Sequence, residues 1–166
     1  TLPSAELTVT TSIGPVDLLC YGFSLPLSDA LQAVLDEYHG WQRSYGAAIS
    51  RGLSALGHGF NDAERLRLLE SYRPHKAVKL QGNTHVKNEL LRDYCVERGF
   101  IIDANDYQPL LQAARGEVEF PPYPYVKDVI PVVKEAGALV AIAHPHGDFN
   151  HGDIGRMDQL RVECRL

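Results

Sequence analysis

The feature that most constrains the fold is an apolar run that ends abruptly in a His-Pro pair. Residues 138–143 are all small or branched apolar residues, and Gly137 precedes them while His144-Pro145 follows. Residues 126–136, before the glycine, have the apolar spacing of a helix. A helix, a glycine and a short apolar strand in this order are typical of α/β folds. We therefore predict a helix over 126–136 and a buried parallel strand over 138–143.

His144 stands where such folds place their ligand-binding side chains, at the carboxyl end of a strand. A neutral imidazole at this position suits a divalent transition metal. A loop histidine that only forms a hydrogen bond is the alternative, and spacing alone does not separate the two. The polar loop that follows is the kind that is commonly just solvated, and we interpret His151 and Asp153 within it in this way.

The first part of the chain predicts a β-hairpin. Residues 5–11 alternate and contain β-branched residues, residues 13–15 form a turn, and residues 16–23 form a more continuously apolar strand. Glu6 and Asp17 interrupt these strands with carboxylates, which are costly among apolar neighbours unless they are exposed, paired or bound to metal. A solvent-facing residue is the simpler interpretation of Glu6, whereas the neighbours of Asp17 look buried.

The middle of the chain is predicted to be helical. Helices are expected from about Ala30 to Leu56, from Asn61 to Leu69, from Thr84 to Gly99 and over 106–114, with Ser28 or Asp29 and Asn61 or Asp62 as caps. Residues 161–166 are expected to open another strand. The predicted fold class is α/β, with segments 1–26 and 116–166 forming one layer and 27–115 forming a helical insertion.

His85 is the candidate binding residue of this insertion. It lies in the segment Gly82–Val86, at a predicted helix start, where free amides and the helix dipole favour anions such as phosphate. An exposed residue of the first helical turn is the alternative. The neighbouring Arg73-Pro74-His75 could also bind phosphate, but we interpret it as an ordinary loop between helices.

Composition excludes several classes of protein. The net charge of −5 gives no general attraction to nucleic acid or to an anionic membrane, so neither duplex nucleic acid nor a membrane is expected as a partner. No signal peptide or membrane-spanning run is visible, so we expect a cytoplasmic protein with its three cysteines reduced and mostly buried. No motif of a serine or cysteine nucleophile is present.

Four segments, in this order, resemble the PHP (polymerase and histidinol phosphatase) family of metal-dependent phosphoesterases. The segment Ser4–Thr8 resembles the family's Gly-Val-Glu-Ile-Ser strand, and Val16–Gly22 resembles its Val-His-Ile-Leu-Gly-Tyr strand. The segment Gly82–Val86 is similar to a Gly-Arg-Thr/Pro-His-Phe/Ile motif, and Glu135–Pro145 is similar to the Ala-Gly-Gly…Leu-Ala-His-Pro segment. The resemblance covers nearly the whole chain.

The resemblance implies a distorted PHP-type (β/α)7 barrel with a helical insertion. It implies that Glu6, Asp17 and His144 are metal ligands and that His85 contacts the substrate. The cofactors would be divalent ions, namely Zn, Mn, Fe or Mg. The implied activity is that of a hydrolase, a phosphoesterase acting on a small phosphorylated substrate such as a nucleotide or short oligonucleotide.

This chain departs from the family pattern at several positions. Asp17 stands where the family has His, which favours a harder ion, and Asn83 replaces an Arg, which removes a bidentate phosphate donor. A Gly-rich stretch at residues 45–48 replaces an often Arg-rich one. An alternative is therefore a degenerate PHP-fold module that binds a nucleotide or a protein partner without catalysis.

The family's paired His-x-His and Asp-x-His ligands would lie before Thr1 and beyond Leu166. We therefore expect both ends to be cuts and the piece alone to be inactive. A missing first strand would leave an open sheet edge, through which copies of the chain could associate.

Overall fold

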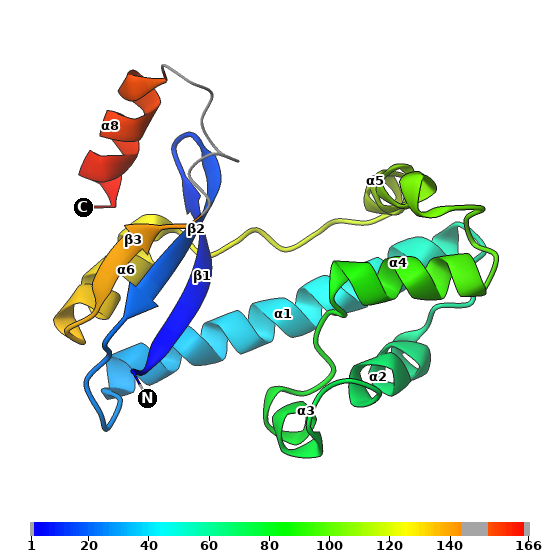
Figure 1. Ribbon diagram of the computed structural model, residues 1–166, viewed down its shortest axis with the longest axis horizontal. Helices are drawn as coiled ribbons and strands as arrows, with labels where there is room; N and C mark the ends of the chain where they lie inside the picture. Colours follow the sequence, from blue (N-terminus) through cyan, green and yellow to red (C-terminus); the bar gives the residue numbers. More distant parts are fainter. Residues whose placement is uncertain (1, 144–152, 165–166) are drawn as a thin grey trace. The chain divides into compact units, whose positions relative to one another are not determined.

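A computed structural model describes residues 2–143 and 153–164 of the chain. The described part has a mixed α/β fold with a small antiparallel sheet (Figure 1). Its strands and helices, in chain order, are β1 (Ser4–Thr11), β2 (Gly14–Tyr21), α1 (Asp29–Ala55), α2 (Asp62–Glu70), α3 (His75–Gln81), α4 (Asn88–Glu97), the 3-10 helix η1 (Ala104–Asp106), α5 (Tyr107–Glu117), α6 (Val126–Glu135), β3 (Leu139–Ile142) and α8 (Ile154–Glu163).

The chain divides into two compact units. Unit 1 contains residues 1–38 and 122–166, and unit 2 contains residues 39–121. The first part of α1 therefore belongs to unit 1 and the rest of this helix to unit 2.

The sheet of unit 1 has the strand order β1-β2-β3. The predicted hairpin is present, because β1 and β2 pair antiparallel along their whole length, from Ser4 opposite Tyr21 to Thr11 opposite Gly14. Gly14 has φ 117°, a conformation that L side chains rarely adopt, which explains the glycine at this turn. Residue alternation gives the sheet one buried face, to which Leu7, Val9 and Leu18 contribute.

The strand predicted over 138–143 is present as β3, but the predicted parallel pairing is wrong. β3 pairs antiparallel with β2, with Tyr21 opposite Leu139 and Leu18 opposite Ile142. The Ser24 N–H donates to the Ala136 carbonyl at 3.0 Å, which fixes the end of α6 beside the end of β2. A strand that starts there must run back along β2, so the connection sets a direction that the apolar run itself does not encode.

The core of unit 1 lies between the sheet and the helices α1, α6 and α8. Its buried apolar residues come from all these elements: Leu7, Val9, Val16, Leu18, Cys20, Phe23, Leu31, Val34, Tyr38, Val126, Val129, Ile130, Val133, Ala136, Ala138, Val140, Leu160 and Cys164.

The strand predicted over 161–166 is wrong where the structure describes it. Helix α8 continues to Glu163, and Leu160 and Cys164 are both fully buried, four residues apart on one helical face. The apolar residues that suggested a strand are therefore the last turn of a helix that packs on the core.

The helices predicted for the middle of the chain are largely confirmed. Helix α1 runs to Ala55 and starts beside Ser28, whose Oγ accepts the Leu31 N–H at 3.2 Å. Asn61 caps α2 by accepting the N–H groups of Ala63 and Glu64. Helix α3 was missed, because its seven residues bury only Val78 and carry little apolar pattern.

Two glycines of α1 allow unit 2 to pack closely. A Cβ on Gly46 would lie 2.7 Å from the Thr84 carbonyl oxygen and 2.8 Å from the backbone nitrogen of His85. A Cβ on Gly52 would overlap the backbone carbonyl of Ala114. Because these contacts are with backbone, a rotamer change cannot relieve them. Gly46 and Gly52 are therefore the positions where other segments of unit 2 cross α1.

The three cysteines are free and buried, as predicted, and burial raises the pKa of each thiol to about 11. Within residues 2–143 and 153–164, no helix is both long and apolar enough to cross a lipid bilayer.

Gly46→Ala should destabilise unit 2 by about 1–3 kcal/mol, because the added methyl overlaps backbone that cannot move independently. Gly40→Ala is the matched control on the same helix, since its Cβ would meet only the Arg43 Nη2 at 3.8 Å. That variant should gain about 0.5–1 kcal/mol from helix propensity. Urea unfolding followed by the fluorescence of Trp41, the chain's single tryptophan, measures both. Equal effects of the two changes would contradict the close-packing explanation.

Candidate functional site

The two candidate carboxylates of unit 1 lie on the same face of the sheet. Glu6 is opposite Leu19 and Thr8 is opposite Asp17, so Glu6 and Asp17 are diagonal neighbours on adjacent strands. Residues in this relation are about 7–8 Å apart, within reach of a shared ligand. Glu6 is exposed and Asp17 is half-buried, whereas their neighbours along each strand point into the core.

Asp17 is held by hydrogen bonds through both its side chain and its backbone. The Thr8 hydroxyl donates to Asp17 Oδ1 at 2.6 Å, and the Ala143 N–H donates to the Asp17 carbonyl at 2.8 Å. The first bond orients the carboxylate and leaves Oδ2 without that constraint. The second places the end of β3 beside Asp17 in the sheet.

Tyr38 supports this arrangement from α1. Its hydroxyl donates to the Thr8 carbonyl at 2.8 Å. Burial raises the pKa of Tyr38, and the neighbouring Cys20, Glu37 and Asp17 raise it further, so the hydroxyl keeps its proton and remains a donor.

His144 lies outside the described residues, as do His146, Asp148 and His151. Ala143, the residue before His144 in the sequence, is the last described residue of this segment. Among residues 2–143 and 153–164, no group of three or more His, Cys, Asp or Glu side chains is placed to hold a metal ion. The described part of unit 1 thus brings together two of the three predicted ligands, Glu6 and Asp17.

His85 is not at a helix start, which corrects the basis of its prediction. Helix α4 begins at Asn88 with Lys87 as its N-cap, so His85 precedes the helix and is not in its first turn. Val86 also precedes the helix, and its buried side chain anchors this segment in the core of unit 2.

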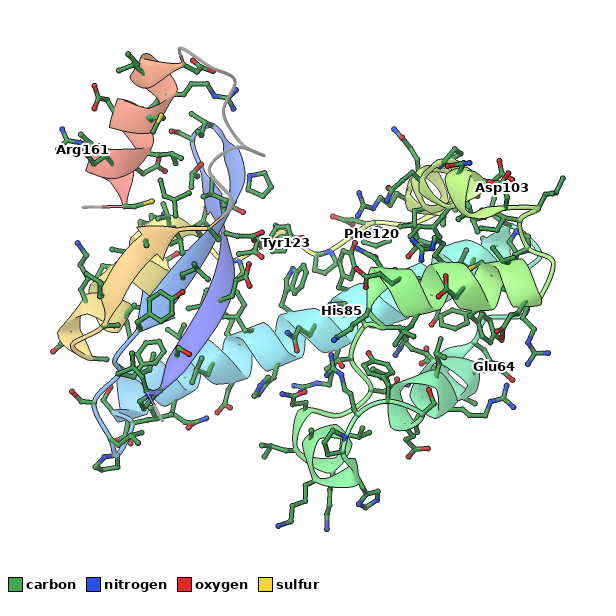
Figure 2. All side chains as sticks on the ribbon, viewed as in Figure 1. Glu64, His85, Asp103, Phe120, Tyr123 and Arg161 are labelled. Atoms are coloured by element: carbon green, nitrogen blue, oxygen red, sulfur yellow. The ribbon has the colours of Figure 1, made fainter. Side chains whose placement is uncertain are left out.

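His85 instead lies in an aromatic cluster beside α1, where Figure 2 shows it together with Phe120. Its ring meets Trp41 and Tyr45 edge to face, at centroid distances of 6.1 and 5.6 Å, and Tyr45 also contacts Phe120 at 5.1 Å. The Nδ1 of His85 is buried and has no hydrogen-bond partner among the described residues. Burial lowers the pKa of His85, and the positive charge of Arg73 lowers it further. The imidazole is therefore neutral at neutral pH.

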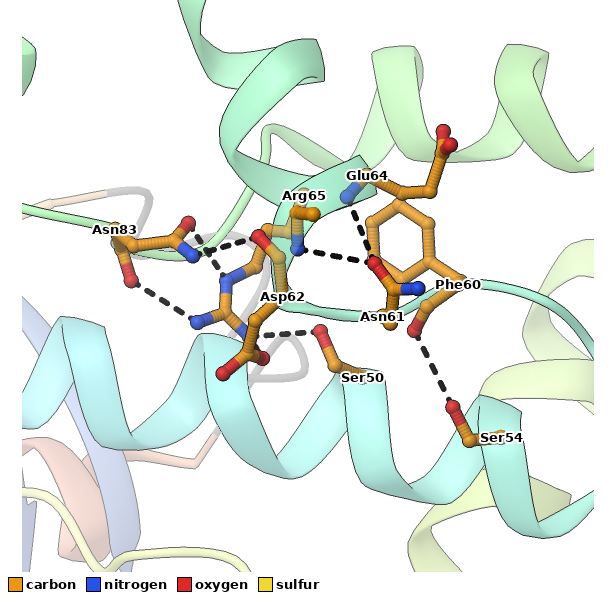
Figure 3. A network of polar contacts seen from close by, with 9 residues as sticks. Ser50, Ser54, Phe60, Asn61, Asp62, Glu64, Arg65 and Asn83 are labelled. Carbon is orange, nitrogen blue, oxygen red and sulfur yellow. Dashed lines mark hydrogen bonds and ion pairs between the residues drawn. The ribbon is translucent and has the colours of Figure 1, made fainter.

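Asn83, which replaces the Arg of the family motif, belongs to a buried polar network around Arg65 (Figure 3). Arg65 Nε donates to Asn83 Oδ1 at 3.0 Å and Nη2 donates to the Asn83 carbonyl at 3.2 Å. Nη1 donates to Ser50 at 2.7 Å and to Asp62 at 2.9 Å. The Asn83 amide in turn donates to the Asp62 carbonyl at 2.8 Å. The oxygen and the nitrogen of the Asn83 side chain therefore both form hydrogen bonds within unit 2.

The Arg65 side chain is only 4% exposed, whereas that of its ion-pair partner Asp62 is 69% exposed. Burial lowers the pKa of Arg65, and Asp62 partly opposes this shift. Because a buried guanidinium needs a partner for nearly every donor, the network specifies the packing of α2 against α1 and the Asn83 segment.

Comparison with known proteins identifies structural neighbours only. No family model matches the sequence, and no curated protein is similar to it. The chain is similar to an amidohydrolase from Chromobacterium violaceum, solved with bound sulfate and no metal, with a TM-score of 0.68 and 18% identity. It is also similar to a protein from Bifidobacterium adolescentis assigned as a metal-dependent phosphoesterase, with a TM-score of 0.57 and 18% identity.

Each alignment covers 98% of this chain but only 54% and 53% of the two neighbours, so the chain spans about half their length. At this identity the similarity shows the fold alone. Both neighbours are hydrolases, which agrees with the class of protein that the sequence resembles.

Sequence reasoning missed the residues that hold the candidates in place. Nothing in the local pattern around Arg65 indicates that it is buried, since its helix carries charged residues at neighbouring positions. The role of Thr8 depends on the hairpin register, which the sequence did not specify: the observed pairing of Thr11 with Gly14 places Thr8 opposite Asp17.

Asn83→Arg should destabilise unit 2 by about 3 kcal/mol, because it removes an acceptor of a buried guanidinium and adds a like charge beside it. Asn105→Arg is the control, at an exposed position of the same unit. Urea unfolding of both variants checks this expectation. A stable Asn83→Arg protein would instead support the interpretation of Asn83 as a lost substrate contact.

The His85 imidazole should make the stability of unit 2 depend on pH. Its pKa is lowered in the fold, so its contribution is present above the unfolded pKa of about 6.5 and is lost as pH falls through the lower folded pKa. The unfolding free energy should therefore drop more between pH 7.5 and 5.5 in the native protein than in His85→Gln. His75→Gln, at an exposed position, should follow the native protein. Parallel pH profiles for all three would contradict the assignment.

Proposed function

We propose that this chain forms part of a metal-dependent phosphoesterase that hydrolyses the phosphate ester of a nucleotide or short oligonucleotide. The observation that supports this most is that Glu6 and Asp17 lie on the same face of adjacent strands, as diagonal neighbours. It occurs within a fold that is similar to that of a protein assigned as a metal-dependent phosphoesterase. In this proposal the sheet is part of a distorted (β/α)7 barrel, and residues 27–115 are its helical insertion.

Glu6 and Asp17 would hold a divalent metal through carboxylate oxygens, and His144 would add an imidazole nitrogen. The two carboxylates lie on the same face of the sheet, as a shared ion requires. Thr8 donates a hydrogen bond to one oxygen of Asp17, and bonds of this kind orient carboxylates that bind metals. An Asp in place of a His favours oxygen-preferring ions such as Mn²⁺ or Mg²⁺. When bound, the metal would lower the pKa of a water molecule and offset charge on the phosphate.

His85 would contact the substrate as a neutral hydrogen-bonding group. The low pKa of this imidazole keeps it uncharged, so it could donate one hydrogen bond to a phosphate oxygen without contributing a positive charge. Its edge-to-face contacts with Trp41 and Tyr45 would hold the ring in one orientation.

A catalytically degenerate module that binds a nucleotide or a protein partner is the second candidate. The sequence feature behind it is Asp17, which stands where the family pattern has a metal-binding His. Asn83 no longer supports it, because this residue serves the Arg65 network and its presence has a structural explanation.

The 166-residue chain alone should release negligible phosphate from nucleotides, with or without Mn²⁺ or Zn²⁺. Hydrolysis by a metal centre needs several fixed ligands, and an error of about 1 Å in position costs on the order of a hundredfold in rate.

A protein extended to the length of the structural neighbours should hydrolyse nucleotides in a chelator-sensitive reaction. In that protein, Glu6→Gln and Asp17→Asn should each lower Mn²⁺ affinity and kcat by at least about tenfold.

Asp128→Asn is the matched control, since this carboxylate is exposed on α6 of the same unit. Mn²⁺ binding, followed by the electron paramagnetic resonance of the free ion, is measured beside phosphate release. Robust chelator-sensitive turnover by the 166-residue chain would refute the incomplete-site argument. An inactive extended protein that still binds nucleotide would favour the degenerate module.

A further inference from the structure

One segment of unit 2 carries basic residues and no acidic ones. Residues 71–87 contain Arg73, Lys76, Lys79 and Lys87 and no Asp or Glu, although the whole chain has a net charge of −5. Arg43 of α1 joins them, because its Nη1 donates to the Gln81 carbonyl at 2.9 Å. We call these five residues the basic surface: Arg43, Arg73, Lys76, Lys79 and Lys87.

The two arginines of the basic surface are held at the end of α3. Arg73 Nη1 donates to Gln81 Oε1 at 2.8 Å and to Thr84 Oγ1 at 3.1 Å, while Arg43 reaches the backbone of the same Gln81. Each guanidinium has five N–H donors, so these bonds fix its position and leave donors for a ligand.

The lysines of the basic surface lie exposed on and after α3. Lys76 and Lys79 are three residues apart on α3 and therefore share a helical face, and Figure 2 shows nitrogen-tipped side chains projecting from this helix. Within the described part of the chain, none of the five cations forms an ion pair with a carboxylate. By contrast, Arg92 and Arg98 of the same unit are paired with Asp93 and Glu64.

An aromatic ring lies between two of these cations. The Arg73 guanidinium is 5.7 Å and the Lys87 ammonium 5.9 Å from the centroid of the Tyr72 ring, which is half-buried. The Tyr72 hydroxyl also accepts a hydrogen bond from the backbone N–H of Lys87 at 3.3 Å. Leu80, 77% exposed, adds an apolar side chain to α3. Cations spaced along a surface beside a partly exposed aromatic ring are a combination that binds single-stranded nucleic acid, since phosphates meet the cations and a base stacks on the exposed part of the ring.

We propose that the basic surface binds the phosphodiester backbone of a single-stranded oligonucleotide. The inference adds a binding surface on unit 2 to the proposed function, and it rests on that function for the chemical class of its ligand. The nearest acidic residues in the sequence, Glu70 and Glu89, flank the segment, and Asp62 is engaged by Arg65. A duplex is not expected to bind as well, because its bases are stacked internally and cannot use Tyr72.

Fluorescence anisotropy with labelled dT12 in EDTA tests the inference in the 166-residue chain without any hydrolysis. Lys76→Glu/Lys79→Glu should weaken binding by roughly tenfold at low salt and reduce the salt slope by about 1.4, that is about 0.7 for each lost phosphate contact. Lys127→Glu/Arg161→Glu changes net charge equally at exposed positions of unit 1 and should bind like the native protein.

Tyr72→Leu should weaken dT12 binding about tenfold while leaving heparin binding unchanged. Thermal unfolding verifies that each variant is folded.

Equal losses in the two charge-reversal variants would overturn the inference, because net charge alone would then explain binding. Equal affinity for a dT12 strand, a duplex and anionic lipid vesicles would overturn it as well, by showing a general polyanion surface. The extended protein separates the two proposals. If it hydrolyses mononucleotides but neither it nor the short chain binds dT12, the proposed function stands and this inference fails.

Discussion

The arrangement of unit 1 depends on where α6 ends relative to β2. The hydrogen bond from Ser24 to Ala136 ties these two ends together, and β3 then has one way to run. Its antiparallel register brings Ala143 opposite Asp17, which is itself opposite Thr8 on β1. Together with the hairpin register of β1 and β2, this connection produces one row of residues that crosses the sheet from Thr8 through Asp17 to the end of β3. The candidate site inherits its geometry from this backbone constraint.

Unit 2 is organised by a different constraint, the cost of burying a charge. Arg65 is almost fully buried, and its donors bind Ser50, Asp62 and the side-chain and backbone carbonyls of Asn83. A missing acceptor would leave part of a guanidinium unsolvated, which costs more than an ordinary hydrogen bond contributes. The segment that carries Asn83 is therefore held firmly, and it continues directly into Thr84 and His85, against which the bare backbone of Gly46 packs.

The sequence predicted elements well where local chemistry determines them. The hairpin follows from alternation and a turn glycine, and the starts of α1 and α2 follow from Ser28 and Asn61, which cap them through their own side chains. It failed where a distant contact decides. The direction of β3 depends on Ser24, and α8 extends to Glu163 because Leu160 and Cys164 reach the core.

The candidate site shows the same division. The hairpin itself was predictable, but the register that brings Glu6 beside Asp17 was not, because the predicted turn at residues 13–15 differs from the observed turn between Thr11 and Gly14. The surroundings of His85 were not predictable, because Trp41 and Tyr45 are about forty residues away in the sequence. They meet His85 only because the segment of Thr84 and His85 crosses α1 at Gly46. Without that crossing, the sequence offered only a helix start, which α4 does not provide at this position.

Asn83 and Asp17 show why a departure from a family pattern cannot be interpreted from the residue alone. Both replace residues that the resemblance assigns to chemistry, yet only Asn83 has its polar groups committed to neighbours of its own fold. Asp17 has one oxygen oriented by Thr8, which leaves the second oxygen able to bind a ligand. A substitution that completes a buried network reflects the demands of packing, whereas one that keeps a ligating atom on the sheet's outer face is consistent with retained chemistry. On this physical ground Asp17 favours a changed metal preference over a lost activity.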